Sequence, residues 1–309
     1  MKILPIGLTV LLSLLTTGHG AESREWKTAD GDKTIQAEYV SAKDGKVTIR
    51  RADNRKIFTI ALDTLSKDDQ DWVAKQMESE SEEAAKADKS NPFAKLLTGE
   101  WQRTEGHGLS YRIYGARKLR GASETGYPLV IYLHGRGGDV MTPEQPGEAR
   151  TFSEEDNYRK RECFIIAPQC PKEQSWDGKN SAAVIEIIGD LVKNLAVDKK
   201  RIYLTGYSMG AYGTFHILGE EPKLFAAGVP IAGGGDPNKA ETYKKVPMWV
   251  FHGAKDDVVK PDQSRRMVEA LEKARATVKY TEYDDGDHGI VGRVYADVKM
   301  HEWLFEQHR

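Results

Sequence analysis

One segment constrains this chain more than any other. Residues 206–210 read Gly-Tyr-Ser-Met-Gly, directly after an apolar run at 202–204 and before a helix-like stretch at 211–218. A serine between two glycines at a strand-to-helix turn is held in a strained backbone conformation that exposes its hydroxyl. A side chain at 206 or 210 would clash with the neighbouring strand or helix. This context makes Ser208 a candidate nucleophile at the carboxyl end of a strand.

Strands and amphipathic helices alternate on both sides of this turn. Apolar side chains at helical spacing predict a helix between 184 and 195. The expected strands lie at 109–114, 128–133, 163–167, 202–204, 246–251 and 277–283. Near-continuous apolar strands between helices indicate a mainly parallel sheet that is covered on both faces. We therefore expect an α/β domain over residues 99–309, with ligands bound beyond the carboxyl ends of its strands.

The first twenty residues differ in composition from the rest. Lys2 precedes a mostly apolar run from 3 to 15, and small residues including Gly18 and Gly20 follow. This pattern is typical of a secretory signal peptide, and the run is too short to span a bilayer. We expect residues 1–20 to be removed, which predicts a secreted or periplasmic protein without a stable membrane anchor. A signal anchor kept in the mature protein is the alternative.

A small β-rich module is expected over residues 21–74. Asp-Gly and Asp-Asn turns separate its strands, and Ser66 is placed to cap a following helix. The alternating segments lie at 33–40, 46–51 and 56–62. Residues 75–98 are rich in acidic residues, serine and alanine, and we expect a charged linker that is either a solvated helix or disordered.

Charge and cysteine content exclude several functions. The 45 Lys and Arg residues nearly balance 47 Asp and Glu residues, which argues against a nucleic-acid binder. Cys163 and Cys170 flank a predicted strand, so their Cα atoms would lie about 23 Å apart, beyond disulfide reach. The chain lacks the nucleotide-loop spacings, a His-Glu-x-x-His segment and clustered Cys and His ligands. We therefore expect no metal and no cofactor.

A catalytic base and acid are expected in loops that follow strands. A serine hydroxyl needs a base to take its proton, and His288, in a turn-rich loop after the last predicted strand, is the best candidate. Asp256 lies just past the strand at 246–251 and would orient this histidine, with Asp257 as the alternative. The order Ser, Asp, His along the chain is the order expected of the α/β-hydrolase arrangement.

Two backbone amides are expected to stabilise a negatively charged oxygen. One is the amide of Met209, at the start of the helix after the turn. The other should come from the glycine-rich loop after the strand at 128–133. There we select the amide of Arg136, with Gly137 as the second choice.

With these residues identified, residues 99–309 resemble α/β-hydrolase esterases of the dienelactone hydrolase, phospholipase/carboxylesterase and polyhydroxybutyrate-depolymerase-like branches. The Leu-His-Gly-x-Gly-Gly loop at 133–138, the Gly-Tyr-Ser-Met-Gly turn and the His-Gly-x-x-Asp segment at 252–256 carry the resemblance. It implies that Trp176 forms part of the pocket wall, and we also place His134 and Tyr207 in the substrate pocket. The nucleophile is Ser208, where true dienelactone hydrolases have cysteine.

Residues 24–73 resemble a small SH3-like module that precedes hydrolase domains in some secreted bacterial proteins. The related eukaryotic module binds an Asn-Pro-Phe-x-Asp peptide. Residues 91–95 of this chain read Asn-Pro-Phe-Ala-Lys, and we expect that match to be coincidental. A peptide or an anionic surface would be the module's ligand. A basic cluster could bind the anionic surface, but we favour the interpretation that these residues form a solvated, charged edge hairpin. The cluster comprises Arg50, Arg51, Arg55 and Lys56.

The sequence thus predicts a secreted serine esterase that hydrolyses a small-molecule or polysaccharide-linked carboxylic ester. Two alternatives remain. One is a serine peptidase of the same fold, and the other is a binding protein that acts through its N-terminal module.

Overall fold

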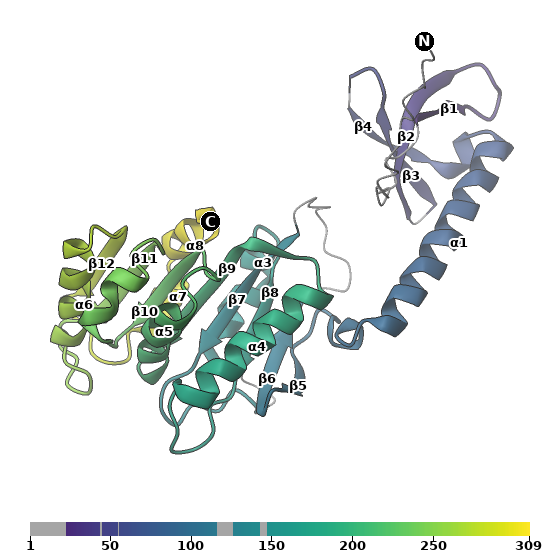
Figure 1. The fold of residues 1–309 in the computed structure, drawn as a ribbon. Coiled ribbons are helices and arrows are strands. Elements are labelled where there is room, and N and C mark those ends of the chain that lie inside the picture. Colours follow the sequence, from purple (N-terminus) through teal and green to yellow (C-terminus); the bar gives the residue numbers. More distant parts are fainter. Residues whose placement is uncertain (1–22, 44, 55, 116–125, 143–146) are drawn as a thin grey trace, which may run out of the picture. The chain divides into compact units, whose positions relative to one another are not determined.

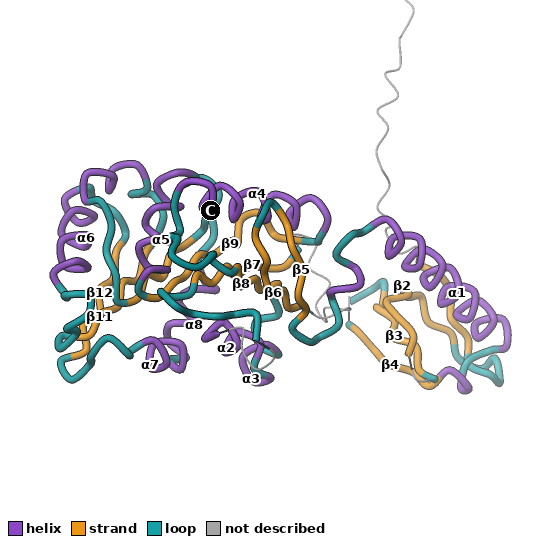
Figure 2. The backbone as a smooth tube through the Cα atoms, turned by 90° about the horizontal axis from the view of Figure 1, so that it is seen from below, coloured by secondary structure: helices purple, strands orange, loops and turns teal. Residues whose placement is uncertain are grey.

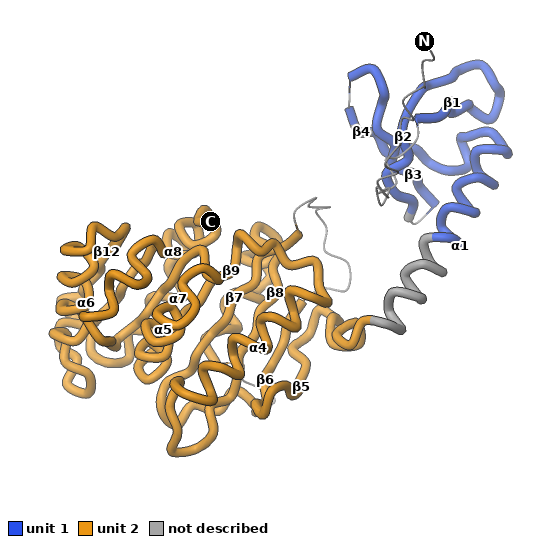
Figure 3. The backbone as a smooth tube through the Cα atoms, viewed as in Figure 1, with its two compact units in different colours: residues 1–87 blue, residues 88–309 orange. Residues whose placement is uncertain are grey.

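The computed structural model describes residues 23–43, 45–54, 56–115, 126–142 and 147–309. The chain forms two compact units, residues 1–87 and 88–309, which are coloured separately in Figure 3. The expected signal peptide at 1–20 lies outside the described residues, as does Arg55 of the basic cluster. Within the described part of the chain, no helix is long and apolar enough to cross a membrane.

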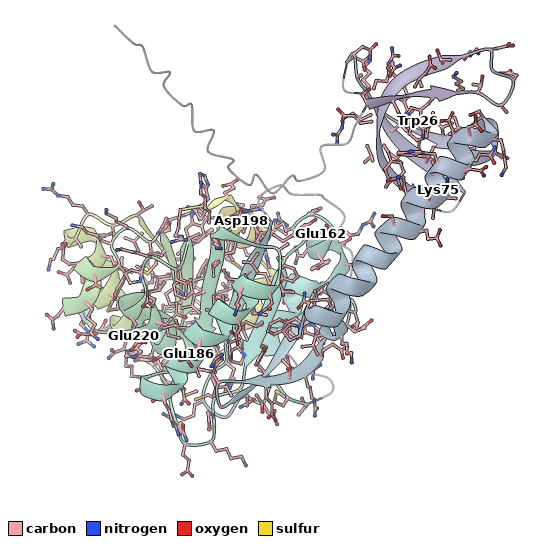
Figure 4. The ribbon with its side chains drawn as sticks, turned by 45° about the vertical axis from the view of Figure 1, so that its right-hand side comes forward. Trp26, Lys75, Glu162, Glu186, Asp198 and Glu220 are labelled. Carbon is pink, nitrogen blue, oxygen red and sulfur yellow. The ribbon has the colours of Figure 1, made fainter. Side chains whose placement is uncertain are left out.

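The N-terminal unit contains an antiparallel four-stranded sheet in the order β1-β2-β3-β4. Its strands are β1 (Ser23–Lys27), β2 (Thr34–Lys43), β3 (Lys46–Arg51) and β4 (Ile57–Ala61). The three alternating segments predicted from the sequence form β2, β3 and β4. The sequence pattern missed β1, whose buried side chain is Trp26, labelled in Figure 4. Trp26 is fully buried in the core that the sheet forms with helix α1 (Lys67–Ser90).

Helix α1 begins where the sequence places its cap. The Ser66 hydroxyl accepts a hydrogen bond from the Asp69 amide at 3.2 Å, as an N-terminal capping residue does. The helix continues to Ser90, so most of the acidic stretch is helical. After a short 3₁₀ turn, η2 (Ala94–Leu96), the second unit continues.

The Asn-Pro-Phe segment is part of the hydrolase unit. Phe93 is 7% exposed and packs in the main core of that unit, and the Asn91 side chain donates to the carbonyl of Asn194 at 2.9 Å. In the N-terminal unit, Arg50 and Arg51 pair with Glu38 and Asp53. These pairings favour the solvated hairpin over a free anion-binding surface.

The second unit is an α/β-hydrolase fold, as predicted. Its sheet has the order β12-β11-β10-β9-β7-β8-β6-β5, in which the β6–β8 and β5–β6 pairings are antiparallel and the others are parallel (Figure 1). The strands are β5 (Gln102–Gly106), β6 (Leu109–Tyr114), β7 (Tyr127–Leu133), β8 (Phe164–Pro168), β9 (Val197–Tyr207), β10 (Ala227–Ile231), β11 (Met248–Gly253) and β12 (Val278–Tyr283).

Helices cover both faces of this sheet, as Figure 2 shows. One face carries α4 (Gly178–Asn194), α5 (Met209–Glu220) and α6 (Asp262–Lys273). The other carries α2 (Arg150–Ser153), α3 (Glu155–Tyr158), α7 (Val291–Ala296) and α8 (Val298–Glu306). Successive side chains of a strand point to opposite faces, so Val130 and Ile131 of β7 belong to different cores. Burial on both faces explains the continuous apolar runs. Both cysteines are buried and free.

Candidate active site

Ser208 lies at a sharp turn between β9 and α5. Its backbone has φ 54° and ψ −115°, a strained conformation for a residue with a side chain, and its amide donates to the carbonyl of Ile231 at 2.8 Å. A Cβ at Gly206 would lie 2.2 Å from the Gly210 carbonyl oxygen. A Cβ at Gly210 would lie 1.9 Å from the Leu133 carbonyl oxygen. The turn therefore requires both glycines, as the sequence predicts.

Three side chains from separate loops form a chain of hydrogen bonds. His288 Nε2 lies 3.0 Å from Ser208 Oγ, and His288 Nδ1 lies 2.6 Å from Asp256 Oδ2. Asp256 follows β11 and His288 follows β12, so two adjacent strands bring them to the edge of the sheet where β9 ends. The structure thus brings together the three residues that the sequence nominated.

Asp256 occupies the place that faces His288, whereas Asp257 is exposed. The Asp256 side chain is 2% exposed, and its Oδ1 accepts the amides of Val258 and Val259 at 2.9 Å each. Because the other oxygen faces His288 Nδ1, that nitrogen donates and Nε2 is left to accept the Ser208 proton. This arrangement can activate a serine hydroxyl for attack on a carbonyl carbon.

Tyr207 holds the loop that carries His288. Its hydroxyl donates to the His288 carbonyl at 2.9 Å, and its ring centroid lies 5.1 Å from that of the imidazole. Burial, followed by the charge of Asp256, raises the pKa of Tyr207 to about 12, so the hydroxyl stays protonated and keeps donating. The residue before the serine therefore fixes the position of the histidine.

The two amides expected to face a developing oxyanion border the same cavity as Ser208. Met209 is the first residue of α5, where backbone amides have no partner inside the helix. Arg136 lies in a turn closed by the Gly138 amide and the Gly135 carbonyl at 3.1 Å. A Cβ at Gly135 would lie 3.3 Å from Ser208 Cβ, so this turn packs directly against the nucleophile. Arg136 and Met209 both line the cavity.

Gly137 occupies the outer part of the same turn. Its φ of 74° favours glycine, the residue is exposed, and no atom comes near a Cβ built there. It is absent from the described lining of the cavity, so Arg136 is the better placed of the two predicted loop donors.

A cavity of about 520 Å³ opens at Ser208. Its walls include three aromatic side chains that are nearly fully buried, Trp176, Phe215 and Tyr243. The sequence predicted Trp176 as a wall residue. It did not predict Phe215, on α5, or Tyr243, which follows the 3₁₀ helix η4 (Pro237–Thr242). No motif marks the segment around η4, so only the fold could reveal it.

His134 and Tyr207 border a different, smaller cavity of about 120 Å³. His134 is 3% exposed, and its Nε2 accepts the Cys170 amide at 2.9 Å while its Nδ1 donates to the Gly135 carbonyl at 2.7 Å. Burial lowers the pKa of His134, which keeps the ring neutral. His134 thus shapes the turn beside Ser208 instead of lining the large cavity. Across the described residues, no group of three His, Cys, Asp or Glu side chains is arranged to hold a metal ion.

Fold and site together define an α/β-hydrolase with a Ser-His-Asp hydrogen-bond chain. Residues 169–299 match the Dienelactone hydrolase family, and residues 18–81 match SLA1 homology domain 1. The two matches fall in the two separate units and confirm both resemblances drawn from the sequence.

Named relatives point to the same class. A solved structure of a thermostable esterase shares 34% identity and a TM-score of 0.64, covering 69% of this chain and 64% of that one. A bifunctional acetylxylan esterase/xylanase from Neocallimastix patriciarum is 27% identical over 168 residues, 53% of this chain. Poly(3-hydroxyalkanoate) depolymerase C from Paucimonas lemoignei is 28% identical over 132 residues, 37% of this chain. The matches span 24% and 29% of these two curated relatives.

Proposed function

We propose that this protein is a serine hydrolase of carboxylic esters. The observation that carries the proposal is the hydrogen-bond chain from Asp256 through His288 to Ser208 at the mouth of a large cavity. The dienelactone hydrolase family match and the esterase of solved structure support the choice of esters. The leader-like segment at 1–20 supports secretion.

The proposed reaction has two halves. Ser208 Oγ attacks the ester carbonyl while its proton passes to His288 Nε2, and the amides of Met209 and Arg136 stabilise the oxyanion. The carbonyl re-forms, the bond to the alcohol oxygen breaks, and His288 returns the proton to the departing alcohol. Water then attacks the acyl-enzyme with His288 as the base, which releases the acid and restores Ser208. Asp256 holds the imidazole in orientation throughout.

The cavity favours an ester with a bulky group over an acetyl ester. Its volume of about 520 Å³ is that of a site for a small molecule, and an acetyl group would leave most of it empty. The Tyr243 hydroxyl is buried and has no hydrogen-bond partner among the described residues, although such groups are normally paired. Burial and then Asp236 raise the pKa of Tyr243, so this buried hydroxyl stays protonated.

A substrate panel tests this proposal. Purified protein would be assayed with the p-nitrophenyl esters of acetic, butyric and cinnamic acid, which share one leaving group, and with peptide p-nitroanilides. We expect ester turnover, with kcat/KM higher for the bulky acids than for acetate. Faster cleavage of the anilides would indicate the peptidase instead. A folded protein inactive on the whole panel would indicate the binding protein.

A further inference from the structure

We infer that His252 is a positioning residue that holds the acid of the triad in place, an inference that rests on the proposed function. His252 belongs to β11, is fully buried, and hydrogen bonds both the loop that carries Asp256, at Val259, and helix α6, at Ser264. In the sequence it is the first residue of the His-Gly-x-x-Asp segment, four residues before the acid, and the segment assigns it no role.

Both oxygens near His252 Nε2 are acceptors. Nε2 lies 2.8 Å from the Val259 carbonyl oxygen and 3.2 Å from Asp256 Oδ2. Because neither oxygen can donate, Nε2 must carry the proton and donate it. Asp256 Oδ2 is the same oxygen that accepts from His288 Nδ1. His252 therefore contacts the working oxygen of the acid.

The other ring nitrogen connects this pair to the backbone behind the nucleophile. Nδ1 lies 2.7 Å from Ser264 Oγ, near the start of α6, and Ser264 Oγ lies 2.8 Å from the Gly233 carbonyl oxygen. Gly233 packs against the nucleophile, since a Cβ built there would lie 3.0 Å from the Ser208 carbonyl oxygen. A second set of contacts, which does not include His288, thus runs from Asp256 to the backbone of Ser208.

His252 restrains a motion of the Asp256 carboxylate that the loop alone would permit. The amides of Val258 and Val259 hold one oxygen of Asp256, but the carboxylate and its loop can still tilt about that contact. By binding the Val259 carbonyl and contacting Oδ2, His252 restrains both the loop and the second oxygen. Because a misplacement of about 1 Å can cost roughly 100-fold in rate, this restraint should act chiefly on kcat.

Steady-state kinetics of three variants test the inference on an ester that the wild type turns over. We expect His252→Leu to lower kcat about 10- to 100-fold and to change KM by less than about twofold. His252→Gln retains an amide donor near the Nε2 position and should recover most of that loss. His301→Leu is the matched control, because His301 is also buried and also bonds a carbonyl, that of Tyr295 at 2.8 Å, but lies outside this network. Its kcat should stay at the wild-type value.

Proton NMR separates positioning from general destabilisation. A histidine Nδ1–H that is bonded to a carboxylate gives a far-downfield resonance, which should be present in the wild type, shifted or lost in His252→Leu, restored in His252→Gln and unchanged in His301→Leu. If His252→Leu does not fold, Ser264→Ala removes the Nδ1 partner and should lower kcat by about two- to fivefold. Wild-type kcat and an unshifted resonance in the folded His252 variants would overturn the inference. An inactive wild type would instead overturn the proposed function.

Discussion

Two aspartates, one from each unit of this protein, are buried to the same extent but have different surroundings. Asp69 in the N-terminal unit and Asp256 in the hydrolase unit are both 2% exposed. Asp69 accepts the Lys27 amide at 2.8 Å, the Ser66 hydroxyl at 2.8 Å and the Arg24 guanidinium at 2.7 Å. Asp256 accepts the amides of Val258 and Val259 on one oxygen, and its other oxygen contacts the imidazoles of His288 and His252. The cost of burying a carboxylate is offset in the same way in both places.

The two sites differ in what the donor side chain, Arg24 or His288, contacts besides the aspartate. Arg24 lies over the rings of Trp26 and Trp72, with its guanidinium carbon 5.0 and 4.2 Å from their centroids. There the buried charge ties a strand to a helix. Behind His288 lie a serine hydroxyl and a cavity. The comparison teaches that burial and hydrogen bonding alone do not distinguish a proposed catalytic carboxylate from a structural one. The group on the far side of its hydrogen-bond partner makes the distinction.

The largest effect is expected when the Ser208 hydroxyl is removed. Ser208→Ala should lower kcat for an ester by about 10⁶-fold, because no other group can form the acyl-enzyme. The variant should keep the wild-type thermal midpoint, since the serine side chain contributes no core packing. Ester hydrolysis rates beside thermal melts check both parts, and substantial remaining turnover would reject the mechanism.

The next largest effect is expected at Asp256, the proposed catalytic aspartate. Asp256→Asn keeps the shape but favours the wrong tautomer of His288, so we expect kcat to fall about 10⁴-fold. Asp257→Asn is the matched control on the neighbouring exposed residue and should keep wild-type kcat. Equal losses in the two variants would show that the acid has been assigned to the wrong residue.

The structural aspartate should respond in the opposite way. Asp69→Asn leaves the Arg24 charge without its partner, so we expect the N-terminal unit to lose about 3 kcal/mol of unfolding free energy. Ester turnover should not change. Urea titration followed by tryptophan fluorescence measures the first effect, and hydrolysis at low urea measures the second. A large loss of kcat would show that the two aspartates are not functionally separate.

The smallest effect on ester turnover is expected when the N-terminal unit is deleted. Deletion of residues 21–90 should leave kcat for a short ester within about twofold of the full chain, because the hydrogen bonds that join Asp256, His288 and Ser208 lie within the hydrolase unit. Activity of the truncated and full chains, compared at equal concentration of folded protein, gives the answer. A tenfold loss would mean that the module contributes to the site.

The sequence predicts the triad because each member sits in a short pattern with a clear backbone requirement. The elbow needs Gly206 and Gly210, and Asp256 and His288 follow strands at one edge of a parallel sheet. The sequence pattern missed β10, whose Ala-Gly-Val-Pro-Ile run is short and contains proline. It also missed the Tyr243 wall, because Tyr243 packs against Phe215 from a distant part of the chain. The His252 network was missed for another reason: its partners Val259 and Ser264 are near in sequence but belong to no recognisable motif.

Covalent labelling tests the central claim most directly. The wild-type protein would be incubated with a fluorophosphonate and the product digested for mass spectrometry. Because only an activated serine reacts readily with this reagent, we predict one label per chain, on the peptide that contains Ser208, with labelling lost in Asp256→Asn and kept in Asp69→Asn. Absence of a label on Ser208, or a label on another serine, would contradict the account.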